Sequence, residues 1–200
     1  MKLLDALQDE HALIDRVLGS FRSYVDALVD GMADAEDGAR FAAFFSEFAG
    51  HFHHDREERV FFHALITQAE LPAERGPVHA LAHEHAEMAQ WLREMTPLLE
   101  RGLRSDDDRT RLQALATRYS RALWRHIDAE NSVLYPQGAE RLARWLTSTL
   151  SFVLLVLLYQ AHYAGHPIDS LASWLSVLAQ AASLDVGVDA VLSAARTFIK

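Results

Sequence analysis

Apolar side chains recur at intervals of three and four residues along most of the chain, which is the spacing of one face of an α-helix. In residues 3–29 this stripe comprises Leu4, Leu7, His11, Ile14, Leu18, Phe21, Val25 and Leu28. Gly31 follows the stripe, as is common where a helix ends. The pattern therefore predicts a first helix over residues 3–29.

The same spacing predicts three more helices, over residues 36–68, 77–101 and 106–135. Pro77 suits a first helical turn, whereas we expect Pro97 to kink the third helix and Pro136 to end the fourth. Strand-like alternation is absent from the sequence. Four helices joined by short loops predict an all-α fold, an antiparallel up-down-up-down four-helix bundle.

The end of the chain has a different pattern. Residues 146–161, LTSTLSFVLLVLLYQA, carry no charge, and weakly amphipathic helices are expected over 170–199. A membrane-spanning helix needs about 20 apolar residues, more than this segment offers. We therefore predict a bundle in residues 1–140 and an apolar helical extension in 141–200. The extension would pack on the bundle or on another copy in a homo-oligomer, with membrane attachment as the alternative.

Composition narrows the function further. The net charge of -9 gives no electrostatic reason to expect binding to nucleic acid. The absence of cysteine excludes disulfides, iron–sulfur clusters and thiolate zinc sites. The first residues, MKLLDALQDEH, lack the pattern of a secretory signal, so we expect a cytoplasmic protein.

Histidines on the predicted stripes follow a repeated order. Each predicted hairpin has one single histidine and then, 42 or 41 residues later, a His-x3-Glu pair. The residues concerned are Glu10-His11 and His53-x3-Glu57 in the first hairpin, and Glu84-His85 and His126-x3-Glu130 in the second. The chain therefore resembles two copies of one helical hairpin.

The second predicted helix leaves two pairings open. His54 and Glu58 have the same i, i+4 spacing as His53 and Glu57, so spacing alone does not separate them. The pair His53/Glu57 matches the other hairpin and shares its face with small apolar residues, whereas the face of His54 includes Glu47. We expect His53/Glu57 to point inward and retain His54/Glu58 as the alternative.

Six side chains would then face the interior: His11, His53, Glu57, His85, His126 and Glu130. An unpaired buried carboxylate costs several kcal/mol, and the stripes carry no Lys or Arg near these positions. Two divalent cations would supply the missing charge, as in the di-iron and di-manganese sites of helical bundles. Imidazole and carboxylate without sulfur suit iron or manganese, and zinc is a further option.

Several motifs together resemble one family. They are Glu10-His11, the run from His53 to Phe62, the block from Gly76-Pro77-Val78 to Glu84-His85, and His126-Ile127-Asp128-Ala129-Glu130 with Leu134-Tyr135-Pro136. With these motifs the chain resembles the hemerythrin-like (HHE cation-binding) family over residues 1–140. The resemblance implies a non-haem di-iron centre bridged by the two glutamates, and a protein that binds O2 or a related ligand such as peroxide or nitric oxide. A stress enzyme that turns over peroxide or nitric oxide, or an iron or oxygen sensor, is the alternative.

One position departs from the oxygen carriers of that family. They resemble this chain but have a fifth histidine four residues before the one that matches His85, where this chain has Leu81. With four histidines and two bridging carboxylates, two positions on each six-coordinate metal stay open. We therefore expect fast autoxidation rather than long-lived storage of oxygen, and expect Leu81→His to reverse this.

Overall fold

The computed structural model describes the backbone of residues 2–163 and the side chains of residues 2–151. Helices make up almost all of this part, and it contains no strand. The elements in chain order are α1 (Lys2–Val29), α2 (Glu36–Ala43), η1 (Phe44–His54), η2 (Glu57–Phe62), α3 (His63–Thr67), α4 (Gly76–Arg101), α5 (Asp106–Ala129), η3 (Glu130–Leu134) and α6 (Tyr135–Tyr163). The predicted all-α class is confirmed.

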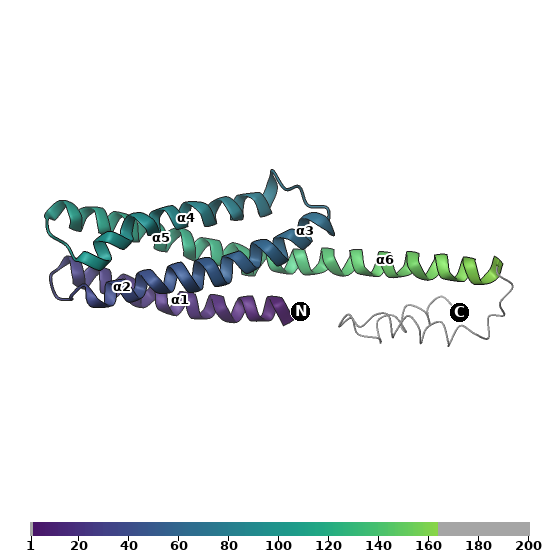
Figure 1. Ribbon diagram of the computed structural model, residues 1–200, viewed down its shortest axis with the longest axis horizontal. Coiled ribbons are helices and arrows are strands. Elements are labelled where there is room, and N and C mark those ends of the chain that lie inside the picture. The colour runs from purple at the N-terminus through teal and green to yellow at the C-terminus, as the bar shows by residue number, and fades with distance from the viewer. Residues whose placement is uncertain (1, 164–200) are drawn as a thin grey trace. The chain divides into compact units, whose positions relative to one another are not determined.

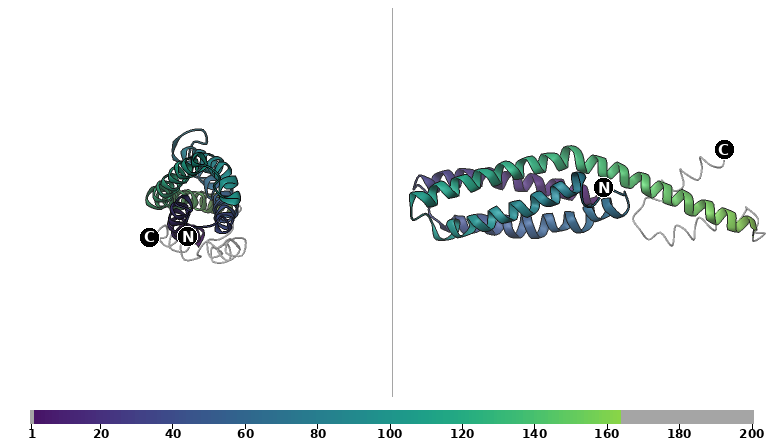
Figure 2. Two further views of the ribbon diagram at one scale, coloured as in Figure 1. Left: turned by 90° about the vertical axis from the view of Figure 1, so that its left-hand side faces the viewer. Right: turned by 90° about the horizontal axis from the view of Figure 1, so that it is seen from above.

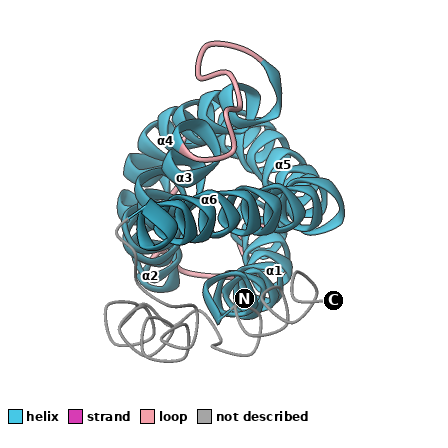
Figure 3. Ribbon diagram, turned by 90° about the vertical axis from the view of Figure 1, so that its right-hand side faces the viewer, coloured by secondary structure: helices cyan, strands magenta, loops and turns pink. Residues whose placement is uncertain are grey.

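Four long helices lie side by side in the bundle (Figure 1). The elements from α2 to α3 form one unbroken helix, here called the second bundle helix, and α5 with η3 forms the fourth. The first helix α1 packs against the second and the fourth, and α4 packs against the same two. The end-on view in Figure 2 and the coloured elements in Figure 3 show this ring of helices. The predicted four-helix bundle is confirmed.

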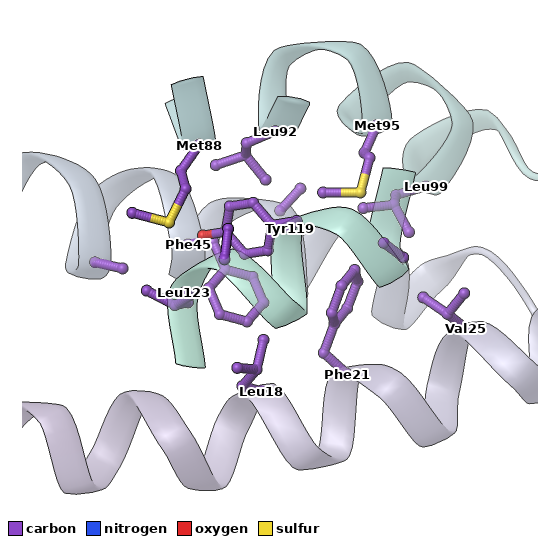
Figure 4. Close-up of a cluster of buried hydrophobic side chains, with 14 of the residues drawn as sticks. Leu18, Phe21, Val25, Phe45, Met88, Leu92, Met95, Leu99, Tyr119 and Leu123 are labelled. Atoms are coloured by element: carbon purple, nitrogen blue, oxygen red, sulfur yellow. The ribbon is translucent and has the colours of Figure 1, made fainter. Parts of the chain in front are cut away.

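The bundle interior has three layers along its length, because every helix passes from apolar to polar to apolar residues. One apolar layer contains Ile14, Phe45, Met88 and Leu123 among others, and Figure 4 shows its side chains meeting from all four helices. The other contains Leu7, Phe61, Leu81 and Leu134 among others. Buried histidines and glutamates occupy the layer between them.

The second and fourth helices contain π-helical turns that the sequence analysis did not predict. They cover η1 and η2 in the second helix and η3 in the fourth. In η3 the amide N–H of Tyr135 donates to the carbonyl of Glu130, five residues earlier. Short π-helical segments inside α-helices often occur at functional sites.

The predicted end of the fourth helix at Pro136 is wrong, because helical backbone continues into α6. Proline usually breaks a helix by losing a hydrogen bond and by crowding the carbonyl four residues earlier. The π turn immediately before Pro136 widens the backbone there and relieves this crowding. Gly138 then lies so close to Phe61 that a Cβ atom would be 2.6 Å from the ring.

The chain divides into two units, residues 1–142 and 143–200. In the second unit α6 forms the helix expected over 146–161, and side chains 146–151 are exposed or half-buried. The other side chains of that segment, and the helices expected over 170–199, lie outside the described residues. Burial of the segment stays a prediction. None of the helices in the described part of the chain combines the length and apolarity that a membrane crossing needs.

Candidate metal centre

The polar layer brings all six residues expected from the sequence together. His11, His53, Glu57, His85, His126 and Glu130 are each at most 5% exposed. Each single histidine comes from a regular helix, α1 or α4, and each His-x3-Glu pair from a helix with π turns. Apolar buried residues flank this layer on both sides along the bundle.

One cluster contains His11, His53, Glu57 and Glu130. The Nε2 atom of His11 lies 3.2 Å from Oε2 of Glu130 and 4.0 Å from Oε1 of Glu57. The Nε2 atom of His53 lies 3.5 Å from Oε2 of Glu57. Two imidazole nitrogens and two carboxylates therefore converge on one point.

A second cluster contains His54, Glu57, His85 and His126. The Nε2 atoms of His85 and His126 are 2.8 Å apart, and that of His85 is 3.6 Å from Oε2 of Glu57. The ring of His54 stacks on that of His85 with centroids 3.9 Å apart. Glu57 belongs to both clusters, so the two clusters are adjacent parts of one centre.

His54 corrects the sequence analysis, which treated His53/Glu57 and His54/Glu58 as alternatives. Both histidines are buried, at 0% and 8% exposure. Glu58 is half exposed and lies outside both clusters; its Oε1 accepts a hydrogen bond from Nδ1 of His85 at 2.7 Å. The wide π-helical backbone of η1 turns two successive side chains inward, which an ordinary α-helix disfavours.

Outer hydrogen bonds fix the orientation of four imidazole rings. Nδ1 of His53 donates to Glu10, and Nδ1 of His126 donates to Glu84, both at 2.9 Å. The other two acceptors are Glu58 for His85 and Asn131 for His11. Carboxylate and amide oxygens only accept hydrogen bonds, so Nδ1 of each ring carries the proton and the lone pair of Nε2 faces the interior. This is how proteins orient metal-binding histidines.

Buried atoms without hydrogen-bond partners are concentrated in this layer. They include Nε2 of His11, His53 and His54, Oε2 of Glu57 and both carboxylate oxygens of Glu130. Such atoms are costly to bury unless they bind something. In the described part of the chain, the basic groups within 4.0 Å of the two carboxylates are all histidines. Nitrogen and oxygen donors of this kind fit divalent transition metals.

Burial and neighbouring charges together set the charges of this layer. It raises the pKa of Glu57 well above the usual range, and the charge of Glu130 adds to this. Burial opposes ionisation of Glu130 as well, but two neighbouring imidazoles hold its pKa below the usual value. Burial lowers the pKa of His53 to about 4 and also lowers that of His54. His53 and His54 therefore favour the neutral form, in which one ring nitrogen keeps a lone pair that can bind a cation.

The hemerythrin HHE cation-binding domain model matches residues 2–137 of the chain. The chain belongs to the hemerythrin HHE cation-binding family. The match covers the whole of the four-helix bundle, and the buried His/Glu layer is compatible with the metal binding that characterises the family. Searches of curated proteins and of solved structures found no match.

Some residues of this hemerythrin-like centre were given no role from the sequence, and His54 was kept only as an alternative. Glu10 and Glu84 were part of the repeat, but their hydrogen bonds across to the next helix depend on packing. For His54 a signal existed. Phe61 and Phe62 are adjacent and both buried. They lie eight residues after His53 and His54, which are also adjacent. Two successive inward positions at both places indicate a helix whose inward face is wider than usual.

Proposed function

We propose that the bundle holds two iron ions and binds O2, or a related ligand such as peroxide or nitric oxide, at them. The two clusters that share Glu57 carry this proposal. A carboxylate common to two groups of histidines suits a bridge between two cations, as in other bundle sites with two metals. Glu130 supports the same role, since its Oε2 lies 3.2 Å from Nε2 of both His11 and His126.

Five histidines, rather than the four expected, supply the nitrogen ligands in this proposal. His11 and His53 would hold one ion, and His54, His85 and His126 the other. If both carboxylates contribute to each ion, six-coordinate metals keep two open positions at the first and one at the second. In this proposal the ion beside His85 would have one open position rather than the two expected. Leu81 lies in the apolar layer, and His54 would take the place of the missing histidine.

A pocket of about 260 Å³ supports access by a small ligand. It lies between η1 and α4, and it extends from surface residues such as His51 and Arg93 to buried His54. Met88 and Tyr119 line its inner part. A diatomic molecule or peroxide fits this space, whereas the apolar layers on both sides of the centre limit bulk water.

Iron would supply the redox chemistry that oxygen binding requires. The chain's own residues would hold the ions, orient five imidazoles and provide two carboxylates that balance the cationic charge. Manganese and zinc fit the same donors. Iron is proposed because redox-inactive zinc would give the centre no reaction with oxygen.

The test uses full-length protein that has been loaded with iron and reduced without air. We expect about two ions per chain and a change in the optical spectrum within seconds of adding O2 in a stopped-flow spectrometer. The spectrum of a Glu57→Gln variant should not change. Stoichiometric iron with no response to O2, peroxide or nitric oxide would refute the proposal. Sustained consumption of peroxide would favour the enzyme, and a response altered by deleting 143–200 would favour the sensor.

A further inference from the structure

An open groove of about 910 Å³ lies between α1 and α5, on the outer side of the bundle. Arg22 of α1 and three arginines of α5, Arg118, Arg121 and Arg125, line it. Trp124 also lines the groove and is 58% exposed. A positively charged groove with an exposed indole is unusual on a chain whose net charge is -9.

In the described part of the chain, the four arginines have no carboxylate partner, which sets them apart from six arginines of the bundle but not from exposed ones such as Arg75. Within the described residues none of the four has a carboxylate within 4.0 Å, whereas six others do: Arg40, Arg56, Arg59, Arg101, Arg109 and Arg111. Two of the four are held in place by other groups. Arg118 lies over the ring of Trp91 at 4.3 Å, and Nε of Arg125 donates to the carbonyl of Arg121 at 3.3 Å.

Ser120 gives independent evidence of a ligand in this groove. It is 3% exposed, it lines the groove, and its hydroxyl has no hydrogen-bond partner. Seven other hydroxyls in the described helices donate to the carbonyl four residues earlier: Ser20, Ser23, Thr67, Thr96, Thr110, Thr147 and Ser151. A buried hydroxyl without a partner is unfavourable, because it has lost its hydrogen bonds to water. A ligand oxygen in the groove would supply the missing partner.

We propose that the groove between Arg22 of α1 and Ser120, Arg121 and Trp124 of α5 binds a phosphate-bearing small molecule with a planar ring. Guanidinium groups match the geometry of phosphate oxygens and donate to them in pairs. The hydroxyl of Ser120 would donate to a phosphate oxygen, and the ring would stack on Trp124. A small ligand is favoured over a nucleic acid, because a long polyanion would be repelled by the acidic remainder of the surface.

The experiment is isothermal titration of the full-length, metal-loaded protein with AMP and with inorganic phosphate. We expect one AMP per chain, and weaker binding of phosphate because it lacks the ring. Ser120→Ala should weaken AMP binding about tenfold, the effect of one hydrogen bond to a charged group. Arg22→Gln combined with Arg121→Gln should weaken it by more. Arg75→Gln, an exposed arginine outside the groove, is the matched control and should have no effect.

Four results would overturn the proposal. These are no binding of either probe at millimolar concentration, binding that neither groove variant weakens, weakening by Arg75→Gln equal to that by the groove arginines, and a single-stranded oligonucleotide that binds more tightly than AMP. The second result would place the anion at another site, such as the metals. Metal content is measured on every sample, so failure of the metal centre is distinguished from failure of the groove.

Discussion

The two helical hairpins of the bundle share one pattern of histidines and glutamates and build opposite sides of one centre. In both, the glutamate before the single histidine accepts a hydrogen bond from the histidine of the next bundle helix. Glu10 does this for His53 and Glu84 does it for His126, at 2.9 Å in each case. This shared pattern orients the two histidines of the His-x3-Glu pairs identically.

Several matched positions differ, and three of these differences lie at the centre. They pair His54 with Ile127, Glu58 with Asn131, and Phe62 with Tyr135. His54 enters a cluster of possible metal ligands, whereas Ile127 packs into an apolar layer. Glu58 gives His85 a charged hydrogen-bond acceptor, whereas Asn131 gives His11 a neutral one.

The third difference concerns two aromatic rings that stack on the single histidines. Phe62 stacks on His85 with centroids 5.8 Å apart, and Tyr135 stacks on His11 at 5.5 Å. The hydroxyl of Tyr135 also donates to Oε1 of Glu57. Phe62 has no hydroxyl, so Glu130 receives no equivalent bond. The repeated pattern thus provides the framework of the centre, and these three differences make its two sides unequal.

The largest expected effect comes from removing the carboxylate that both sides share. Glu57→Gln keeps the shape but loses the charge, so we expect metal content to fall from two ions per chain to less than one. Metal analysis of protein folded in excess iron measures this. Glu47→Gln, which removes an exposed charge from the same helix, is the control. Two ions retained in Glu57→Gln would show that Glu57 does not hold both.

The second largest effect is expected from making the two hairpins alike at position 54. His54→Ile introduces the residue found at the matched position 127 and removes one ligand from one cluster only. We expect this variant to keep one tightly bound ion and lose the other, or bind it at least about tenfold more weakly. His51→Ala, an exposed histidine on the same helix, should keep both ions. Equal loss in the two variants would show that His54 is not a ligand.

The fold and six positions of the centre could be predicted because they depend on periodicity. In α1 the buried stripe steps by three and four, which matches an α-helix and gives the correct inward face. In the second bundle helix it steps by four from Phe45 onward, through Phe45, Ala49, His53, Glu57, Phe61 and Leu65. In an α-helix each such step drifts by about 40°, so five steps would turn the stripe by about 200°.

The π turns correct this drift, because they hold more residues per turn and keep the stripe inward. The constant step of four was therefore a detectable indication of π turns in the second bundle helix. The outer partners of the histidines were not predictable in the same way. Glu58 and Asn131 reach across to other helices, and which ring each one contacts depends on the rotation of packed helices that sequence spacing does not specify.

A third effect concerns pH and again compares His54 with isoleucine, now without metal. Burial holds the pKa of His54 well below 6.5, so the unfolded chain takes up a proton that the folded chain excludes. The parent therefore loses stability as pH falls below 6.5, whereas His54→Ile loses less. Relative to the parent, the variant should gain about 2 kcal/mol between pH 7.5 and pH 5. Urea unfolding at the two pH values measures this, and parallel changes would contradict it.

The smallest expected effect comes from exchanging the outer hydrogen-bond acceptors. A charged acceptor makes an imidazole a stronger metal ligand than a neutral one does, and such partners typically change metal affinity about tenfold or more. Glu58→Gln gives His85 a neutral acceptor, so the ion held by His85 should be released about tenfold faster. Asn131→Asp gives His11 a charged acceptor, so the ion held by His11 should be released more slowly.

Transfer of metal to a chelator, followed over time, measures both changes. It should show two phases, and the two variants should shift different phases in opposite directions. Glu47→Gln should shift neither. If both variants changed the same phase, or changed release in the same direction, the acceptors would not be the cause of the inequality between the two sides.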